Sequence, residues 1–199
     1  MKKIFALFAG AGLVALAHAS PTVPTNTADV SYQVAKSVNA ALKLANQLNW
    51  QVGDFHKIDI KMAFGGGDGT KSVTQEVPAE GAFWYVNEMS LFGQAQKTEA
   101  LMRRSDGKVL KLIVNGKEET PDAGDSNIEI IEQTETSITV GAGKFDCFYI
   151  KAKVTSDGKT QELEAWINPV DVNLDGMLKI VIQSQFGPIT MTLKEFGHK

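Results

Sequence analysis

Cysteine and histidine are scarce in this chain. It has one cysteine, Cys147, and three histidines among 199 residues. A single cysteine cannot form an internal disulfide, and so few cysteines and histidines cannot supply a zinc site. The Gly-x-Ser-x-Gly motif of many hydrolases is absent, and no set of nucleophile, base and oxyanion donors emerges. We therefore expect a protein that is not an enzyme.

Long apolar runs and excess positive charge are lacking after residue 19. Lys2 and Lys3 precede the short run IFALFAGAGLVALA, and AHAS follows, which predicts a signal peptide over 1–19. The remaining chain has 18 basic and 23 acidic residues, a net charge of −5. That charge gives no attraction to nucleic acid or anionic membranes. We expect an exported protein, periplasmic or secreted, with no transmembrane segment in the mature chain.

One helix is expected near the start of the mature chain. Residues 20–28 read as a flexible leader, and 29–199 as a single β-rich domain. Within 29–48 an apolar stripe recurs at three- and four-residue steps, which predicts an amphipathic helix that packs on a sheet. The stripe consists of Val30, Val34, Val38, Leu42, Ala45 and Leu48.

The pattern changes to a period of two after Trp50. In HKIDIKMAF, His56 and Ile58 share one face and Lys57 and Asp59 the other, which indicates a half-buried strand. About ten such segments follow, separated by the turn signals SDGK, NGK and SDGK. Short turns force antiparallel pairing. The fold class expected is mainly β (α+β): a curved antiparallel sheet, a half-barrel or barrel-like meander, with the N-terminal helix packed on it.

Two motifs resemble known ligand loops. GGGDGTKS at 65–72 resembles a phosphate-binding loop but has Thr70 where that motif requires glycine, and a strand follows. A flexible hairpin loop is the favoured interpretation. In PVDVNLDGML, Asp171, Asn173 and Asp175 have the spacing of an EF-hand calcium loop, but its twelfth position is Ile182. A turn is favoured there, and calcium stays a weaker candidate.

Other reactive residues have structural interpretations. Cys147 alternates with apolar neighbours in KFDCFYIKA, which favours a small buried hydrophobe over a reactive thiol. His56 fits a strand end or core edge better than a catalytic base. The pairs Glu162/Glu164 and Glu118/Glu119 are typical of solvated faces.

Aromatic and methionine side chains are the remaining signal. They predict either an ordinary core or the lining of an apolar cavity for a hydrophobic ligand. The cavity candidates are Phe64, Trp84, Phe92, Trp166, Met177 and Phe186.

Several segments resemble a broad group of exported, β-rich bacterial envelope proteins. These segments are WQVGDFHKIDIKM, GAFWYVNEMSLFG, SDGKVLKLIVNGKEETP, TVGAGKFDCFYIKAK, EAWINP and GMLKIVIQSQFGPITMTLKEFG. The chain departs from that group at PVDVNLDGML, where a shorter apolar turn is usual. In architecture such proteins are similar to periplasmic lipoprotein carriers, and that similarity implies a concave sheet able to hold acyl chains.

Two functions from different classes follow. The first is a non-enzymatic envelope protein that holds a lipid or acyl chain in the concave sheet, with residues 29–48 as its lid. The second is a structural or protein-interaction module with no small ligand, whose exposed strand edges pair with an envelope protein partner.

Overall fold

The computed structural model describes residues 50–199, apart from 64, 92, 121–126, 157–158 and 185–186. The predicted signal peptide, leader and helix 29–48 lie outside the described residues. The strands are β1 (Asp54–Met62), β2 (Gly65–Val77), β3 (Ala82–Leu91), β4 (Gln94–Arg103), β5 (Val109–Val114), β6 (Lys117–Glu119), β7 (Asn127–Val140), β8 (Gly143–Ser156), β9 (Lys159–Ile167), β10 (Met177–Ser184) and β11 (Gly187–His198).

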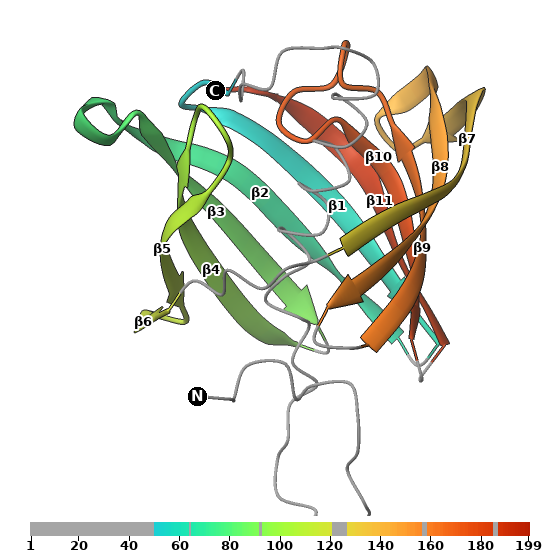
Figure 1. Ribbon diagram of the computed structural model, residues 1–199, viewed down its shortest axis with the longest axis horizontal. Coiled ribbons are helices and arrows are strands. Elements are labelled where there is room, and N and C mark those ends of the chain that lie inside the picture. Colours follow the sequence, from blue (N-terminus) through green and yellow to red (C-terminus); the bar gives the residue numbers. More distant parts are fainter. Residues whose placement is uncertain (1–49, 64, 92, 121–126, 157–158, 185–186) are drawn as a thin grey trace, which may run out of the picture.

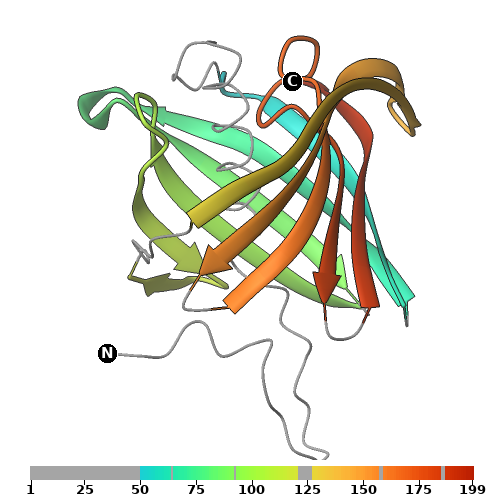
Figure 2. The same cartoon turned by 45° about the vertical axis from the view of Figure 1, so that its right-hand side comes forward.

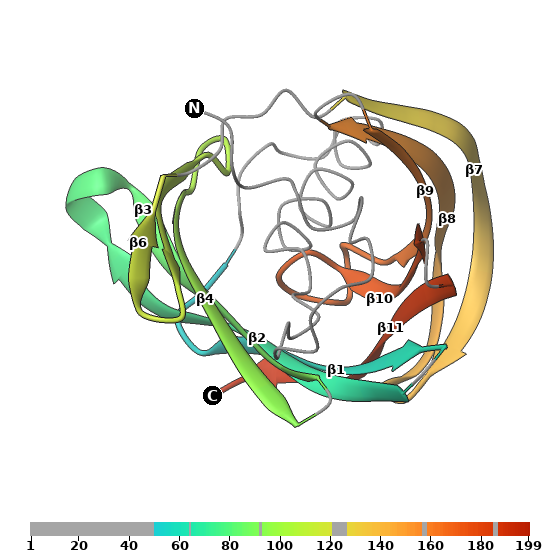
Figure 3. The same cartoon turned by 90° about the horizontal axis from the view of Figure 1, so that it is seen from below.

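All eleven strands belong to one antiparallel sheet, in the order β6-β5-β4-β3-β2-β1-β11-β10-β9-β8-β7. The order consists of two meanders, β1–β6 and β7–β11, joined where β1 pairs with β11. The sheet is strongly curved and open, with β6 and β7 at its two edges (Figures 1 and 2). Seen from below, the strands trace a U (Figure 3). The expected curved antiparallel meander is confirmed in the form of an open sheet.

Turn chemistry explains the hairpins that the sequence signalled. Asn115 and Gly116 connect β5 to β6 with φ values of 50° and 79°, as an Asn-Gly hairpin turn requires. Gly107 turns between β4 and β5 with φ of 67°. The short 3-10 helix η1 (Pro78–Glu80) connects β2 to β3. Within the described residues, no helix combines the length and the apolar character that crossing a membrane requires.

The glycine-rich segment after β1 is a correction to the sequence prediction. Residues 65–72 lie in strand β2, not in a flexible hairpin loop. Gly67 pairs with Leu91 of β3, and a Cβ at Gly67 would overlap the carbonyl oxygen of Ser90. Gly69 would press a Cβ against the Ile58 side chain at 3.0 Å. Glycine is needed here because neighbouring strands approach closely, and not because the chain turns.

The side of the sheet that carries the core follows from one contact. Nζ of Lys71 on β2 lies 3.8 Å from Sδ of Met177 on β10, although β1 and β11 separate those strands. Adjacent strands lie about 4.8 Å apart. The strands that carry Lys71 and Met177 are three strand spacings apart in the sheet. Their side chains can therefore meet only if the sheet curves around them, so both lie on the concave face.

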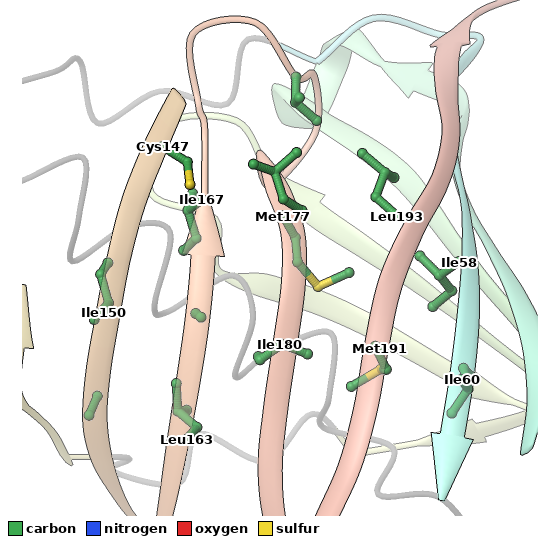
Figure 4. Packing of buried hydrophobic residues seen from close by; sticks show 14 of the residues in the cluster. Ile58, Ile60, Cys147, Ile150, Leu163, Ile167, Met177, Ile180, Met191 and Leu193 are labelled. Carbon is green, nitrogen blue, oxygen red and sulfur yellow. The ribbon is translucent and has the colours of Figure 1, made fainter. Parts of the chain in front are cut away.

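Two apolar clusters cover this face. The large apolar cluster extends from β3 to β8, and Figure 4 shows its side chains on neighbouring strands. It consists of Ile58, Ile60, Met89, Leu91, Cys147, Ile150, Ala152, Leu163, Ala165, Ile167, Val172, Met177, Leu178, Ile180, Met191 and Leu193. The small apolar cluster lies on β2, β3 and β4 and at the entry to β1. It consists of Trp50, Val73, Phe83, Tyr85, Ala100 and Met102.

Candidate functional site

A row of four buried polar side chains crosses the concave face. The register pairs His56 of β1 with Lys71 of β2. Lys71 pairs in turn with Asn87 of β3, and Asn87 with Thr98 of β4. Paired residues of antiparallel strands point to the same face. Their exposed fractions are 0, 3, 3 and 7%. These four residues are called the polar row.

The polar row separates the two apolar clusters. On β3, Phe83 and Tyr85 belong to the small cluster, whereas Met89 and Leu91 beyond Asn87 belong to the large one. A buried polar group without a partner costs about 1–3 kcal/mol. A polar line through an apolar face therefore needs partners, and the loop before β10 supplies some of them.

Lys71 is held by the loop of residues 168–176, between β9 and β10. Its Nζ donates a hydrogen bond to Oδ2 of Asp175 at 2.6 Å and contacts Sδ of Met177. Asp175 is itself buried. A lysine ammonium has three N–H groups. The third has no partner in the part of the chain that the structure describes.

The same loop orients His56. Asn173 donates from Nδ2 to the carbonyl oxygen of Gly197 at 2.8 Å, which leaves its Oδ1 to accept from Nε2 of His56 at 3.0 Å. Nε2 therefore carries the proton in the neutral ring. Nδ1 then carries no proton. It lies 3.5 Å from Oδ1 of Asp175 and makes no hydrogen bond.

The loop is fixed by short-range polar contacts of the kind that turns use. Oδ1 of Asn168 accepts from the backbone amides of Val170 and Asp171, at 3.0 and 2.8 Å. Oδ1 of Asp175 accepts from the amide of Met177 at 3.1 Å. Gly176, with φ of 66°, turns the chain into β10. The stretch is thus a turn that projects Asn173 and Asp175 onto the concave face.

The three calcium candidates are engaged with different partners. Asp171 accepts from Nδ2 of Asn168 at 2.7 Å, Asn173 accepts from His56, and Asp175 accepts from Lys71. Among the described residues, no group of three or more His, Cys, Asp or Glu side chains is placed to hold a metal ion. Calcium binding by this loop stays a prediction.

Burial and charge set the protonation states around Lys71. Burial lowers the pKa of His56, and Lys71 adds to that, while Asp175 and Asn173 oppose it. For Asp175, burial alone raises the pKa, but the Lys71 charge, the neighbouring His56 ring and the hydrogen bonds to Asp175 outweigh burial and lower it. Burial, followed by Asp175, raises the pKa of Tyr85 well above its ordinary value. The site thus favours neutral His56 beside an ionised Lys71–Asp175 pair.

Three buried polar atoms at or near the row have no hydrogen-bond partner in the described structure. They are Nδ1 of His56, Oδ1 of Asn87 and Nε1 of Trp50. The Trp50 ring stacks on Tyr85, with ring centroids 5.3 Å apart. Buried polar atoms are usually paired, so this concentration of unpaired atoms marks the row as the candidate site.

The pKa shifts predict a stability that falls on acidification. The unfolded chain protonates His56 near its ordinary value of 6.5, while the folded chain resists protonation, so unfolding becomes easier as pH falls below 6.5. Below 3.8, protonation of Asp175 removes further stability. Each group contributes a slope of at most about 1.4 kcal/mol per pH unit.

Urea unfolding between neutral and acid pH measures this effect. His56→Gln keeps a polar side chain near Asn173 but does not titrate, and we expect it to flatten the decline that begins below pH 6.5. His198→Gln, at the exposed end of β11, is the matched control and should retain the decline. An unchanged decline in His56→Gln would contradict the assignment.

The structure distributes the predicted cavity residues over both faces. Met177 lies in the large apolar cluster on the concave face. Trp84 alternates with Phe83 and Tyr85 and so points to the opposite face of β3. Trp166 is paired with Tyr149 and stacks under Nζ of Lys179 at 4.5 Å, on the face opposite to Ala165. Phe64, Phe92 and Phe186 lie outside the described residues.

Two other sequence candidates occupy ordinary positions. Cys147 is a free, buried residue of the large cluster, and burial raises the pKa of its thiol. Glu162 and Glu118 form ion pairs with lysines of neighbouring strands, at 3.5 and 3.0 Å, with side chains substantially exposed. These carboxylates therefore belong to solvated faces.

Sequence reasoning missed Lys71 and Asn87. A signal for Asn87 was present, because it interrupts the alternating apolar series Phe83, Tyr85, Met89 and Leu91 of one strand face. Lys71 lies between a glycine-rich segment and the mainly polar stretch SVTQEV, so nothing local indicates that its side chain is buried.

No protein-family model and no curated protein matches the sequence. A protein from Parabacteroides distasonis, proposed to be a lipoprotein, is 13% identical with a TM-score of 0.43, over 75% of this chain and 97% of that one. A proposed exported protein with a YmcC-like fold from Bacteroides fragilis is 14% identical with a TM-score of 0.41, over 77% and 99%.

A further structural neighbour is the MucA/MucB complex of Pseudomonas aeruginosa, at 11% identity and a TM-score of 0.44. The match covers 85% of this chain and 56% of that one, so this chain spans about half of its length. The first two neighbours carry descriptions of the exported class that the sequence resembles. At identities and TM-scores this low, the similarity carries no inference about ligand or partner.

Proposed function

We propose that this chain is an exported, non-enzymatic protein that holds a hydrophobic ligand against its concave face. The observation that supports it is a single, open, curved sheet whose hollow side is apolar from β3 to β8. Apolar sites with a few placed polar groups are typical of ligand binding. In the described residues no second sheet packs against this face.

The proposal of a non-enzymatic role follows from the polar row itself. His56, the one buried histidine of the described chain, is bonded to an amide, Asn173, and not to a hydroxyl or thiol nucleophile. Lys71 is paired with a carboxylate at 2.6 Å. This ion pair stabilises the charged forms of Lys71 and Asp175, so neither side chain is activated as a base.

Native mass spectrometry of the mature protein, purified from the periplasm without detergent or chelator, tests this proposal. We expect a mass excess equal to one lipid, released on collisional activation and then identified. A bare chain that also fails to take up added lipid would contradict the proposal. A calcium-sized adduct, lost in Asp171→Ala, would instead support the metal interpretation of the loop.

A matched pair of variants connects the ligand to the concave face. Ile180→Phe adds bulk within the large apolar cluster on β10 and should lower lipid retention. Lys179→Met, its neighbour, lies over Trp166 on the opposite face and should retain the lipid. Equal retention in both variants would place the ligand elsewhere.

The edge strand β7 favours a second function, pairing with a protein partner. β7 has 14 residues and pairs only with β8 within the described sheet. Ile130 and Ile131 are 37 and 47% exposed on it. Three glutamates and no basic residue occur over 127–140. An extended basic segment would therefore complement this edge.

Ile131→Lys tests the second function. If β7 binds an extended basic segment, the substitution places like charge at the edge and should abolish a complex that the unmodified protein forms. Thr74→Lys on β2 changes a comparable exposed position in the interior of the sheet and is the control. A complex that survives Ile131→Lys would contradict pairing through β7.

A further inference from the structure

The unpaired atoms of the polar row have a definite chemical character. The third N–H of Lys71 needs an acceptor, whereas Nδ1 of His56 and Oδ1 of Asn87 need donors. These groups come from three adjacent strands, with Lys71 in the middle. A hydroxyl group is both donor and acceptor. Two or more hydroxyls on neighbouring carbon atoms could satisfy all three.

The charge balance of the row disfavours an ionic ligand. Lys71 is neutralised by Asp175 at 2.6 Å, and His56 is neutral when buried. The cluster is thus electrically balanced before any ligand binds. A phosphate or carboxylate would add a buried charge without a counter-charge, which is costly.

The polar row would also orient a bound ligand relative to the large apolar cluster. Ile58 and Met89, the next concave-face residues along β1 and β3, are apolar and belong to the large cluster. A polar head on the row therefore places an attached chain over apolar side chains.

We propose that the polar row binds the neutral, polyhydroxyl head group of an amphipathic lipid, a glycerol or a sugar, with its acyl chain on the large apolar cluster. This inference rests on the proposed function and adds the class of head group. Asn87 accepts from one hydroxyl, and Lys71 donates to a second or to the same oxygen. His56 accepts at Nδ1.

Three probes of equal chain length test the head group: monolauroylglycerol, dodecyl glucoside and laurate. Dissociation constants are measured by titration below the micellar range, using tryptophan fluorescence. We expect at least one of the two neutral probes to bind about tenfold more tightly than laurate, since one satisfied buried polar group corresponds to about that factor. The comparison of glycerol with glucoside identifies the source of the hydroxyls.

Asn87→Leu removes the acceptor and keeps a side chain that branches at the same carbon. It should weaken the binding of the preferred neutral probe about tenfold and leave the affinity for laurate unchanged. Glu88→Gln, the next residue and exposed on the other face, is the control.

Binding of all three probes with equal affinity would overturn the head-group assignment and leave the proposed function standing. Equal affinity in Asn87→Leu, with raised stability, would mean that the row holds only water. Failure of every probe to bind would overturn both.

Discussion

Replacing Lys71 by methionine is expected to destabilise the fold by about 3–5 kcal/mol, because it leaves the Asp175 carboxylate buried without its cation. Methionine is also unbranched and only one atom shorter than lysine, so the loss is chiefly electrostatic. The midpoint of urea unfolding at neutral pH measures it, with the slope checked for two-state behaviour. The deficit should shrink at acid pH, because without Lys71 the pKa of Asp175 rises and the carboxyl group takes up a proton.

Lys57→Met is the matched control for Lys71→Met. Lys57 donates to Glu195 at 2.7 Å, nearly the same distance as in the buried pair, but both side chains are about half exposed. Exposed pairs contribute about 0–1 kcal/mol, so the control should change little. The double variant Lys71→Met with Asp175→Asn should recover about 2 kcal/mol of the loss, since no uncompensated charge remains. Equal effects of the two lysine variants would contradict a buried pair.

Gly67→Ala is expected to destabilise the fold by about 3 kcal/mol, although alanine is usually preferred to glycine in a strand. A Cβ at this position would overlap the Ser90 carbonyl oxygen of β3, which is backbone and has little freedom to move. The stiffer unfolded chain of the alanine variant offsets only about 0.4–1 kcal/mol. Thermal or urea unfolding measures the difference.

Gly197→Ala is the control for Gly67→Ala. A Cβ there would meet only the ring of Phe55, at 3.3 and 3.5 Å, and a side chain yields more easily than backbone. We expect a change below about 1 kcal/mol. A mild effect of Gly67→Ala would show that β2 and β3 separate readily, and it would contradict glycine as the cause of their close approach.

The strands and their buried faces could be predicted from the sequence because polar and apolar residues alternate along them. Ile58 and Ile60 lie on the concave face and Lys57 and Lys61 on the other, as a period of two requires. The Asn115–Gly116 hairpin follows from turn chemistry. The glycine-rich start of β2 was misread because glycine has two uses, turning the chain and admitting a neighbouring backbone. Local sequence does not distinguish them.

The candidate site was harder to predict because its groups meet only through distant pairing. Lys71 and Asp175 are 104 residues apart in sequence, and His56 and Asn173 are 117 apart. The calcium-like spacing of the loop singled out Asn173 and Asp175, which do belong to the candidate site, although not as metal ligands. Asn173 and Asp175 do bind through their oxygens, but to His56 and Lys71. Which basic side chain faces a given carboxylate depends on sheet register and not on spacing along the chain.

The position of β11 has a consequence for the order in which the sheet assembles. β11, residues 187–198, lies in the middle of the sheet and pairs with β1, and one contact there joins residues 138 apart. Each meander can form from near neighbours in sequence, but the seam between them requires strands from opposite ends of the described chain. A chain that is synthesised from its N-terminus exposes two unpaired strand edges, on β1 and β10, until β11 arrives. Until β11 pairs, these two edges are sites at which strands of other chains can add, and we expect the half-assembled sheet to be prone to aggregation.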